Sequence, residues 1–198
     1  QSDSQFNTGF YYRDGRGCEQ SYERAAEWFE KAARQGDADA QYNLGNAYYR
    51  GHGVPQCYER AVEMFKQSAA QGNMHGRNNL GTMYEHGRGV AQNYKEARRL
   101  YALALAQDPT KPNRIQALNE LDELIRTECP LLGKRVVITG TSREDLNGKA
   151  GVATDFDHAK GRYVVTLNGK DGKVVKLKPE HVQEHVPVST SGAAEGKG

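Results

Sequence analysis

Apolar and polar residues in the first half of the chain follow one pattern that repeats every 36 residues. Within each copy, the apolar positions recur three and four residues apart, the spacing that places side chains on one face of an α-helix. The copies align without any insertion, which chance does not produce. Residues 2–108 are therefore predicted to hold three structural repeats. The positions that recur include Gly9, Gly45 and Gly81; Tyr12, Tyr48 and Tyr84; Ala25, Ala61 and Ala97; and Phe29, Phe65 and Tyr101.

Each copy is predicted to form two helices, as the middle copy illustrates. Residues 40–50 form the first helix, with Leu44 and Tyr48 among its apolar positions. Residues 51–55 (Gly-His-Gly-Val-Pro) end it, because glycine adopts the left-handed conformation of a helix cap and proline cannot continue a helix. Residues 58–71 are predicted as the second helix.

Gly45 lies inside the first of these helices, where glycine costs about 1 kcal/mol relative to alanine. We expect a close approach of the two helices to offset this cost, with Gly45 facing Ala61 and Phe65 filling the space beside them. Two short helices cannot bury their apolar faces alone, whereas three stacked pairs share one core. The predicted fold of this half is an α-solenoid of three helical hairpins.

A further helix is predicted over residues 109–128, beginning near Pro112. It has one apolar stripe and is polar on its outer face, as a helix that covers the end of a solenoid must be. We therefore interpret residues 109–128 as a capping helix. The stripe consists of Ile115, Leu118, Leu121 and Ile125.

After Cys129 the pattern changes to a period of two, which is typical of β-strands. Residues 129–134 are predicted as a linker, residues 135–187 as a small β domain, and residues 188–198, rich in Ser, Gly and Ala, as a disordered tail. Asn-Gly and Asp-Gly pairs mark turns, and short strands at this spacing favour a small closed barrel. The predicted strands cover residues 135–139, 151–156, 162–167 and 173–177, followed by a one-turn helix over 179–182 and a last short strand near Val186.

The repeat resembles a known family. Residues 40–72 (AQYNLGNAYYRGHGVPQCYERAVEMFKQSAAQG) and residues 78–104 (NNLGTMYEHGRGVAQNYKEARRLYALA) are similar to Sel1-like repeats, which are relatives of tetratricopeptide repeats. The specific signature is the LGxxYxxGxGV core recurring every 36 residues. The first copy departs from it, with Thr8 at the leucine position and Cys18 at the valine position. Because this copy has no capping helix before it, further repeats are expected upstream in a longer protein.

The second half resembles the SH3-like barrels that are attached to repeat and zinc-finger domains in multidomain proteins. This resemblance implies a fold rather than a ligand. Together, the two resemblances imply a multidomain protein, α then β: an α-solenoid of three helical-hairpin repeats plus a capping helix, followed by a small SH3-like β-barrel. The residues that carry the second resemblance are Leu146-Asn147-Gly148, Gly151, Gly161-Arg162-Tyr163, Val165 and Leu177-Lys178-Pro179.

Charged residues make up 26% of the chain and hydrophobic residues 37%, which suits a soluble globular protein. Residues 133–198 carry 11 Lys and Arg against 8 Asp and Glu, and residues 1–132 carry 16 against 17, so neither half has a strong basic excess. No apolar run approaches the roughly 20 residues that span a bilayer. Cys18, Cys57 and Cys129 favour unpaired thiols in the cytoplasm or another reducing compartment. The alternative is an organelle that is reached after removal of a leader.

The sequence contains no catalytic or metal-binding pattern. The Gly-x-Gly triplets follow helices rather than strands and lack the Lys-Ser/Thr of a P-loop. The 6 histidines are scattered, and no nucleophile–histidine–acid arrangement is signalled. Some secreted bacterial relatives associated with β-lactam binding carry a regular cysteine pair in each repeat, whereas the cysteines of this chain do not recur. We therefore predict a protein that is not an enzyme and needs no cofactor or metal.

Binding residues are predicted on the first helix of each repeat, because helical-pair solenoids commonly line the inside of their curve with these helices. At the outward positions of these helices the residue differs between the three repeats, whereas at the core positions it recurs. The varying outward positions can therefore encode a binding surface. The alternative is a solvated face without a partner. Tyr and Arg are enriched in binding hot spots, so Phe10, Tyr49 and Arg50 are the expected anchors. The predicted protein-binding residues are Phe10, Arg13, Asn46, Tyr49, Arg50, Arg77, Glu85 and His86.

These features predict a non-catalytic protein–protein interaction adaptor or scaffold that binds protein or peptide ligands on its concave solenoid face. The alternative is an RNA- or ribosome-associated protein that uses the SH3-like barrel. For that alternative, Tyr163 is the candidate for stacking on a base, although nearby acidic residues largely cancel the positive charge. The candidate phosphate-binding residues are Lys149, Lys160, Arg162, Lys170, Lys173, Lys176 and Lys178.

Overall fold

A computed structural model describes residues 2–110, 112–169 and 171–186. The chain divides into two compact units, with the boundary between Glu128 and Cys129. Each unit is described by itself. The tail predicted over residues 188–198 lies outside the described residues.

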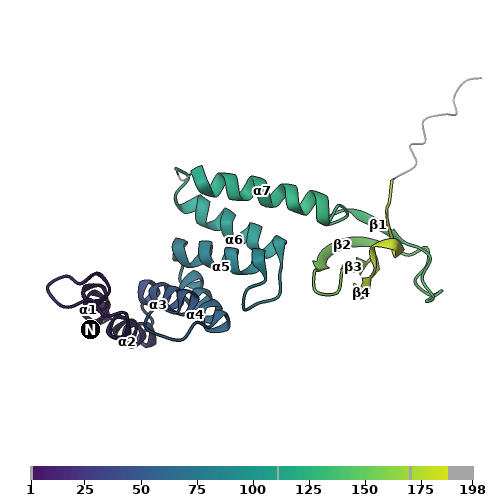
Figure 1. Ribbon diagram of the computed structural model, residues 1–198. Coiled ribbons are helices and arrows are strands. Elements are labelled where there is room, and N and C mark those ends of the chain that lie inside the picture. The colour runs from purple at the N-terminus through teal and green to yellow at the C-terminus, as the bar shows by residue number, and fades with distance from the viewer. Residues whose placement is uncertain (1, 111, 170, 187–198) are drawn as a thin grey trace, which may run out of the picture. The chain divides into compact units, whose positions relative to one another are not determined.

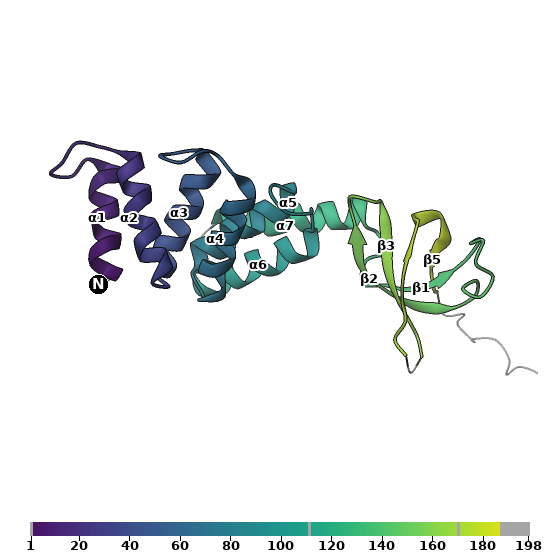
Figure 2. The ribbon, with the colours of Figure 1, turned by 90° about the horizontal axis from the view of Figure 1, so that it is seen from below.

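The first unit is a solenoid of helical hairpins, as the repeat pattern predicts (Figure 1). The hairpins are α1–α2, α3–α4 and α5–α6, and each packs on the next through the contacts of α2 with α3 and of α4 with α5. Figure 2 shows α1 to α4 side by side in chain order. The helices are α1 (Ser2–Asp14), α2 (Tyr22–Arg34), α3 (Ala38–Arg50), α4 (Tyr58–Ala70), α5 (Met74–His86), α6 (Tyr94–Gln107) and α7 (Pro112–Glu128).

Most helix starts have a polar side chain that caps them. Ser21, Asp37 and Asn93 each accept a hydrogen bond from the backbone N–H three residues later, and Asn73 accepts from two such groups. Cys57 occupies the equivalent position before α4 and makes no such bond. The helix starts are therefore fixed by local chemistry that the 36-residue period carries along the chain.

A second recurring polar contact closes each hairpin loop. A glutamine side chain at the same position of every repeat donates a hydrogen bond of 2.8 Å to a carbonyl oxygen near the end of the first helix. The same amide nitrogen also lies within hydrogen-bond distance of the tyrosine hydroxyl two residues later. This contact ties the loop to both helices. The pairs are Gln20 with the carbonyl of Arg13, Gln56 with that of Tyr49, and Gln92 with that of Glu85.

The glycine inside each first helix makes room for an aromatic ring. A Cβ atom at Gly45 would lie 2.6 Å from Cε1 of Phe65, and the same contact recurs at 2.6 Å between Gly81 and Tyr101. The prediction that the helices approach closely at this glycine is confirmed. The ring of Phe65, rather than Ala61, lies directly over Gly45, while Ala61 is fully buried in the same cluster.

A different glycine sets the spacing between hairpins. Gly53 has a φ of +74°, and a Cβ atom there would lie 2.1 Å from the carbonyl oxygen of Tyr22 in the preceding hairpin. Gly89 makes the same close approach to the backbone of Tyr58, at 2.4 Å. Gly17, at the equivalent position of the first hairpin, would place its Cβ within 4 Å of no atom in the described part of the chain. Stacking of hairpins therefore requires glycine at Gly53 and Gly89.

Helix α7 packs on α6 through a face centred on Leu121, which is fully buried. Leu118 and Ile125 are partly buried on the same face, as predicted. The prediction for Ile115 is wrong, because this side chain is 45% exposed. The buried face includes Leu124 instead.

The second unit is an antiparallel sheet in the order β4-β3-β2-β1-β5. Four strands lie within a few residues of their predicted positions. The last short strand, predicted near Val186, is present a few residues earlier: Val182 pairs with Ile138 and is buried, whereas Val186 is 75% exposed. The elements are β1 (Arg135–Ile138), β2 (Ala150–Asp157), β3 (Arg162–Leu167), β4 (Val174–Leu177), the short 3₁₀ helix η1 (Pro179–His181) and β5 (Val182–Glu184).

The predicted closure of this sheet is not found. Within residues 129–169 and 171–186, β4 pairs with β3 and β5 pairs with β1, and no pairing joins β4 to β5. The physical reason is that η1 turns the chain away after β4, so that β5 reaches the far edge of the sheet. The sheet is therefore open, with a core that includes Val136, Ile138 and Val165.

Across the described helices, none is both long enough and apolar enough to cross a lipid bilayer.

Candidate interaction groove on the first helices

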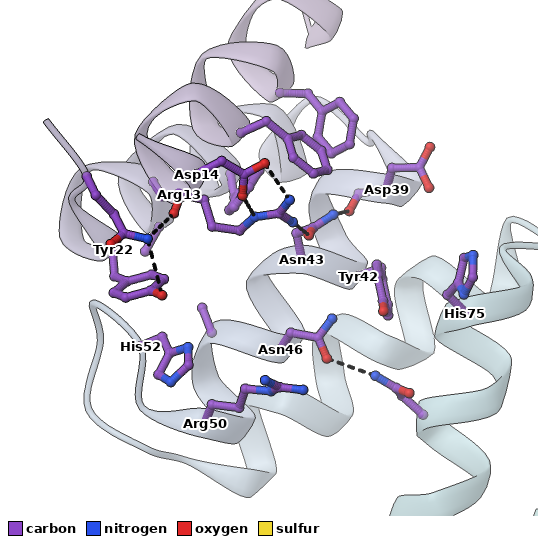
Figure 3. A pocket seen from close by; sticks show the side chains of 18 residues that line it. Arg13, Asp14, Tyr22, Asp39, Tyr42, Asn43, Asn46, Arg50, His52 and His75 are labelled. Carbon is purple, nitrogen blue, oxygen red and sulfur yellow. Dashed lines mark hydrogen bonds and ion pairs between the residues drawn. The ribbon is translucent and has the colours of Figure 1, made fainter. Parts of the chain in front are cut away.

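A groove of about 710 Å³ lies along the first helices of the three hairpins (Figure 3). Its lining comes mainly from α3, with four residues each from α1 and α2, two from α5 and two from the hairpin loops. On α3 the lining residues are three and four positions apart, so they form one stripe of the helix. These residues are Asp39, Tyr42, Asn43, Asn46, Ala47 and Arg50.

One end of the groove is aromatic. The rings of Phe6 and Phe10 meet edge to face with centroids 4.7 Å apart, and Phe10 packs against Phe29 at 5.7 Å. The guanidinium of Arg13 lies 4.0 Å from the centre of the Phe10 ring. Phe6 and Phe10 are only partly buried, so this end can contact an apolar side chain of a ligand.

Arg13 is held in place by its neighbours. It donates to both carboxylate oxygens of Asp14, at 2.7 and 3.1 Å, and to the side-chain oxygen of Asn43 at 3.2 Å. The hydrogen bond from Arg13 lowers the pKa of Asp14, and the charges of Arg13 and Arg16 act in the same direction. The charge of Arg13 is thus already compensated within the groove, and its bond to Asn43 joins α1 to α3.

Two asparagines join the next pair of helices. The side-chain nitrogen of Asn79 on α5 donates a hydrogen bond of 2.8 Å to the side-chain oxygen of Asn46 on α3. The NH₂ group of Asn46 and the side-chain oxygen of Asn79 have no partner among the described residues. The pair therefore presents one donor group and one acceptor, which is what the backbone of a bound peptide requires.

Arg50 is the cation of the groove that no other side chain satisfies. It is the last residue of α3 and is exposed. Its side chain makes no hydrogen bond or ion pair with residues 2–110, 112–169 or 171–186. Figure 3 shows its side chain beside Asn46. An unpaired guanidinium offers several N–H donors in a plane and a full positive charge, so it suits a carboxylate or carbonyl group of a ligand.

Two histidines of the groove pack on tyrosines. The ring of His52 lies 4.8 Å from that of Tyr22, and the ring of His75 lies 5.4 Å from that of Tyr42. No group of three or more potential metal ligands lies close together in the described part of the chain. These side chains extend the aromatic lining rather than forming a metal centre.

The structure brings together half of the predicted binding residues. Phe10, Arg13, Asn46 and Arg50 all line the groove. Sequence reasoning did not select Asn43, Tyr42 or Asn79. The spacing of three and four residues from Asn46 could have identified Asn43 and Tyr42, because such positions share a helix face.

The other four predicted residues lie elsewhere. Tyr49 packs against Tyr58 and accepts a hydrogen bond from Arg88. Arg77 lies in a separate groove beside α4 and α6. The remaining two are on the last turn of α5: Glu85 accepts a hydrogen bond of 2.6 Å from Tyr101, and His86 is exposed.

The bond between Glu85 and Tyr101 is part of the packing of the third hairpin. Tyr101 is 3% exposed, and its hydroxyl lies 3.0 Å from that of Thr82. Burial is the main cause that raises the pKa of Tyr101 far above its usual range, and the bond to Glu85 adds to it. Gln41 on α3 is also internal, because it is buried and its side-chain oxygen accepts a hydrogen bond of 2.7 Å from Gln71.

The predicted base-stacking role of Tyr163 is wrong. Tyr163 is 2% exposed, and its hydroxyl accepts a hydrogen bond of 3.2 Å from the backbone N–H of Leu131. Burial raises the pKa of this phenol. The ring belongs to the core because Tyr163, Val165 and Leu167 alternate onto the same buried face of β3.

Comparison with known proteins gives a family and a set of similar solved structures. The Sel1 repeat model matches residues 2–37, 38–73 and 75–109, which is more than half of the chain. The Sel1 repeat protein from Oxalobacter formigenes is 35% identical, over 54% of this chain and 44% of that one, with a TM-score of 0.52. The protective antigen c5321 of uropathogenic Escherichia coli strains, which displays an SLR fold, is 36% identical, over 54% of this chain and 23% of that one, with a TM-score of 0.54.

This chain thus corresponds to less than half the length of either structure. Comparison with curated proteins gives no match.

Proposed function

The chain belongs to the Sel1 repeat family, and from that premise we propose that it is a non-catalytic adaptor that binds a segment of a partner protein in the groove along α1, α3 and α5. Proteins built from Sel1 and tetratricopeptide repeats are generally protein-interaction adaptors. Their stacked hairpins create extended surfaces without a catalytic centre.

The observation that carries this proposal is the set of unsatisfied groups around Asn46. The guanidinium of Arg50 and the free polar atoms of Asn46 and Asn79 lie in one groove, whose aromatic end contains the partly exposed ring of Phe10. Bound water satisfies such groups in the free protein, and a partner's backbone and side chains would replace it. An apolar residue beside Phe10 and a carbonyl or carboxylate at Arg50 would fix the register of the bound segment.

The rigidity of the groove supports the same role. Hydrogen bonds from Arg13 to Asn43 and from Asn79 to Asn46 cross from one hairpin to the next. The lining residues therefore keep their relative positions in the absence of a ligand. Binding then costs less conformational entropy than it would at a surface that has to be ordered first.

The test is affinity purification with the full chain as bait, followed by mass spectrometry and measurement of the Kd of each partner found. Arg50→Glu reverses the unpaired charge in the groove. Lys66→Glu makes the same change in net charge at an exposed position on α4 that does not line the groove. We expect Arg50→Glu to weaken binding about tenfold or more and Lys66→Glu to leave it within about twofold. Equal affinities of the two variants would argue against this groove.

RNA or ribosome association, the alternative expected from the sequence, has less support. The second unit has two aromatic residues, Phe156 and Tyr163, and neither is exposed. Proteins that bind single strands without sequence preference combine positive charge with aromatic platforms for the bases. The second unit offers the charge without a platform.

We propose an SH3-like arrangement for the second unit. Its support is the pairing of β5 with β1 across the sheet and the position of η1 between β4 and β5. A solution structure in which β5 pairs with any strand other than β1 would contradict it.

We propose that the protein works in a reducing compartment. None of its three cysteines forms a disulfide, with Cys18 exposed and Cys129 buried. Labelling with a thiol reagent in intact cells should modify Cys18 without prior reduction. Labelling only after reduction would point to an oxidising compartment instead.

A further inference from the structure

The second unit ends its sheet with a strand whose outer edge is open. Among residues 129–169 and 171–186, β4 pairs with β3 alone, and the register places Val175 opposite Val165 and Leu177 opposite Tyr163. The N–H of Leu167 donates to the carbonyl of Lys173 at 2.9 Å. Because hydrogen-bonded and non-bonded pairs alternate along an antiparallel ladder, the backbone groups of Val174 and Lys176 point away from β3.

The side chains of β4 follow the same alternation. Val175 and Leu177 are buried in the core, whereas Lys176 is exposed and Val174 is 56% exposed. An exposed apolar residue beside unpaired backbone groups is a template for another strand. Natural edge strands commonly use lysine to discourage such pairing, and lysine discourages it least for a strand of opposite charge.

A groove of about 450 Å³ lies beside this edge and is positively charged. Its lining contains five cationic side chains and one histidine, and it contains no Asp or Glu. The residues come from β3, β4, the segment after β4 and the loop after β1. They are Arg143, Arg162, Lys173, Lys176, Lys178 and His181.

Three of these cations have acidic neighbours outside the groove. Arg143 pairs with Asp145 at 2.8 Å, Lys176 with Asp157 at 3.0 Å, and Lys178 with Glu180 at 3.4 Å. All three cations are more than half exposed, although Asp157 is only 19% exposed. An ion pair at the surface contributes little, so a ligand can compete for the cation.

The other two cations are free for a ligand. The side chains of Arg162 and Lys173 make no hydrogen bond or ion pair with any described residue. The groove therefore has a net positive charge directly beside an unpaired strand edge.

We infer that the β4 edge binds an acidic, extended segment of a partner protein, which adds to the sheet as a sixth strand. The backbone of that segment bonds to the outward N–H and C=O groups of Val174 and Lys176. Val174, Lys176 and Arg162 lie on the same face of the sheet. On that face an apolar residue of the segment covers Val174, and its carboxylates, two residues apart, lie beside Lys176 and Arg162.

A peptide fits this site better than a nucleic acid. A strand edge presents backbone donors and acceptors in the pattern of another polypeptide, and a phosphate backbone has no donors to match the exposed carbonyl groups. The aromatic rings that single-stranded nucleic acids stack on are missing here, because Tyr163 is buried and Phe156 packs between Tyr163 and His158.

The inference is tested with the full chain and a fluorescent synthetic peptide of about seven residues, Val-Thr-Glu-Thr-Glu-Thr-Glu, which places Val and Glu on one face of a strand. Binding is followed by fluorescence anisotropy at low and high salt, and by NMR shifts of the amides of Val174 and Lys176. We expect saturable binding that salt weakens, with the largest shifts at these two amides. An N-methylated copy of the peptide, which has the same charge but cannot pair as a strand, should bind at least about tenfold more weakly.

Variants of the chain provide the second arm. Lys173→Glu combined with Lys176→Glu should weaken peptide binding about tenfold or more. Lys149→Glu combined with Lys160→Glu makes the same charge change outside the groove and should leave binding within about twofold. Equal binding of the peptide and its N-methylated copy would overturn strand addition, and this comparison needs no variant to fold.

Oligouridylate of matched charge is the competing ligand. Tighter binding of oligouridylate than of the peptide, with the same amides shifted, would assign the groove to nucleic acid and overturn the inference. Binding of neither ligand at low salt would overturn it as well.

Discussion

The contact between Gly53 and Tyr22 makes the stacking of hairpins directly testable. Gly53→Ala places a methyl group where the structure has 2.1 Å to the carbonyl oxygen of Tyr22. The left-handed φ of +74° costs an alanine about 1–2 kcal/mol by itself. Separating the two backbones to make room costs about 1–3 kcal/mol more, as overpacking of a core does. We expect a total loss of about 2–5 kcal/mol.

Two glycines with similar backbones serve as controls for this prediction. Gly17 has a φ of +72° and would meet no described atom within 4 Å, and Gly72 has a φ of +89° with the nearest atom at 3.7 Å. Alanine at either position should cost only the backbone strain, about 1–2 kcal/mol. Gly72 lies between α4 and α5, so the comparison does not depend on the end of the solenoid.

Urea unfolding followed by far-UV circular dichroism measures the three variants against the unchanged chain. The account requires Gly53→Ala to lose about 1–3 kcal/mol more than Gly72→Ala. Equal losses for the two would show that the backbone contact between hairpins does not limit their spacing, and the stacking argument would fail.

Three further predictions concern single contacts. Gln56→Ala removes the bond to the carbonyl of Tyr49 and should cost about 0.5–1.5 kcal/mol in thermal unfolding, whereas Gln67→Ala, at an exposed position on α4, should cost little; equal losses would refute the role of the loop glutamine. NMR titration should find the pKa of Asp14 below its usual range and returned to that range by Arg13→Ala, and no change would contradict the pairing. Because the pKa of Tyr101 is raised on folding, its contribution to stability is complete below about pH 10 and decreases at higher pH. In urea unfolding, Tyr101→Phe should therefore lose less stability above about pH 10 than the unchanged chain does. An equal loss of stability in the two proteins would contradict this.

The period of 36 residues predicted the solenoid because every copy repeats the same local signals. Gly45, under the ring of Phe65, and the turn glycine Gly51 can both be identified from their recurrence every 36 residues. The loop glutamines Gln20, Gln56 and Gln92 recur at the same interval and could also have been found. Contacts within a repeat can therefore be recognised from residues that recur at the 36-residue interval.

The second unit was less predictable because its contacts are long-range. Val182 becomes a strand by pairing with Ile138, more than forty residues earlier, which no local pattern indicates. Tyr163 is different, since its alternation with Val165 and Leu167 already assigned it to a buried face. The predicted base-stacking role of Tyr163 was wrong because it rested on residue type, whereas strand periodicity decides which face of β3 the ring occupies.

The candidate groove was predictable only in part. The 36-residue interval identifies equivalent positions in the three repeats, whereas a groove follows one stripe of a helix. Tyr49 lies beside the stripe that contains Asn46 and Arg50. The pairing of Glu85 with Tyr101 also could not be read from spacing, because it depends on how α5 and α6 pack.

Photo-crosslinking tests the central claim most directly. A photoreactive amino acid replaces Asn46 in one full-length chain and Lys66 in another, and each is irradiated with the partner obtained by affinity purification. The account predicts a covalent adduct from position 46 and none from position 66, because only the first lines the groove. An adduct from position 66 alone, or adducts of equal yield from both, would contradict the claim that the partner binds along the first helices.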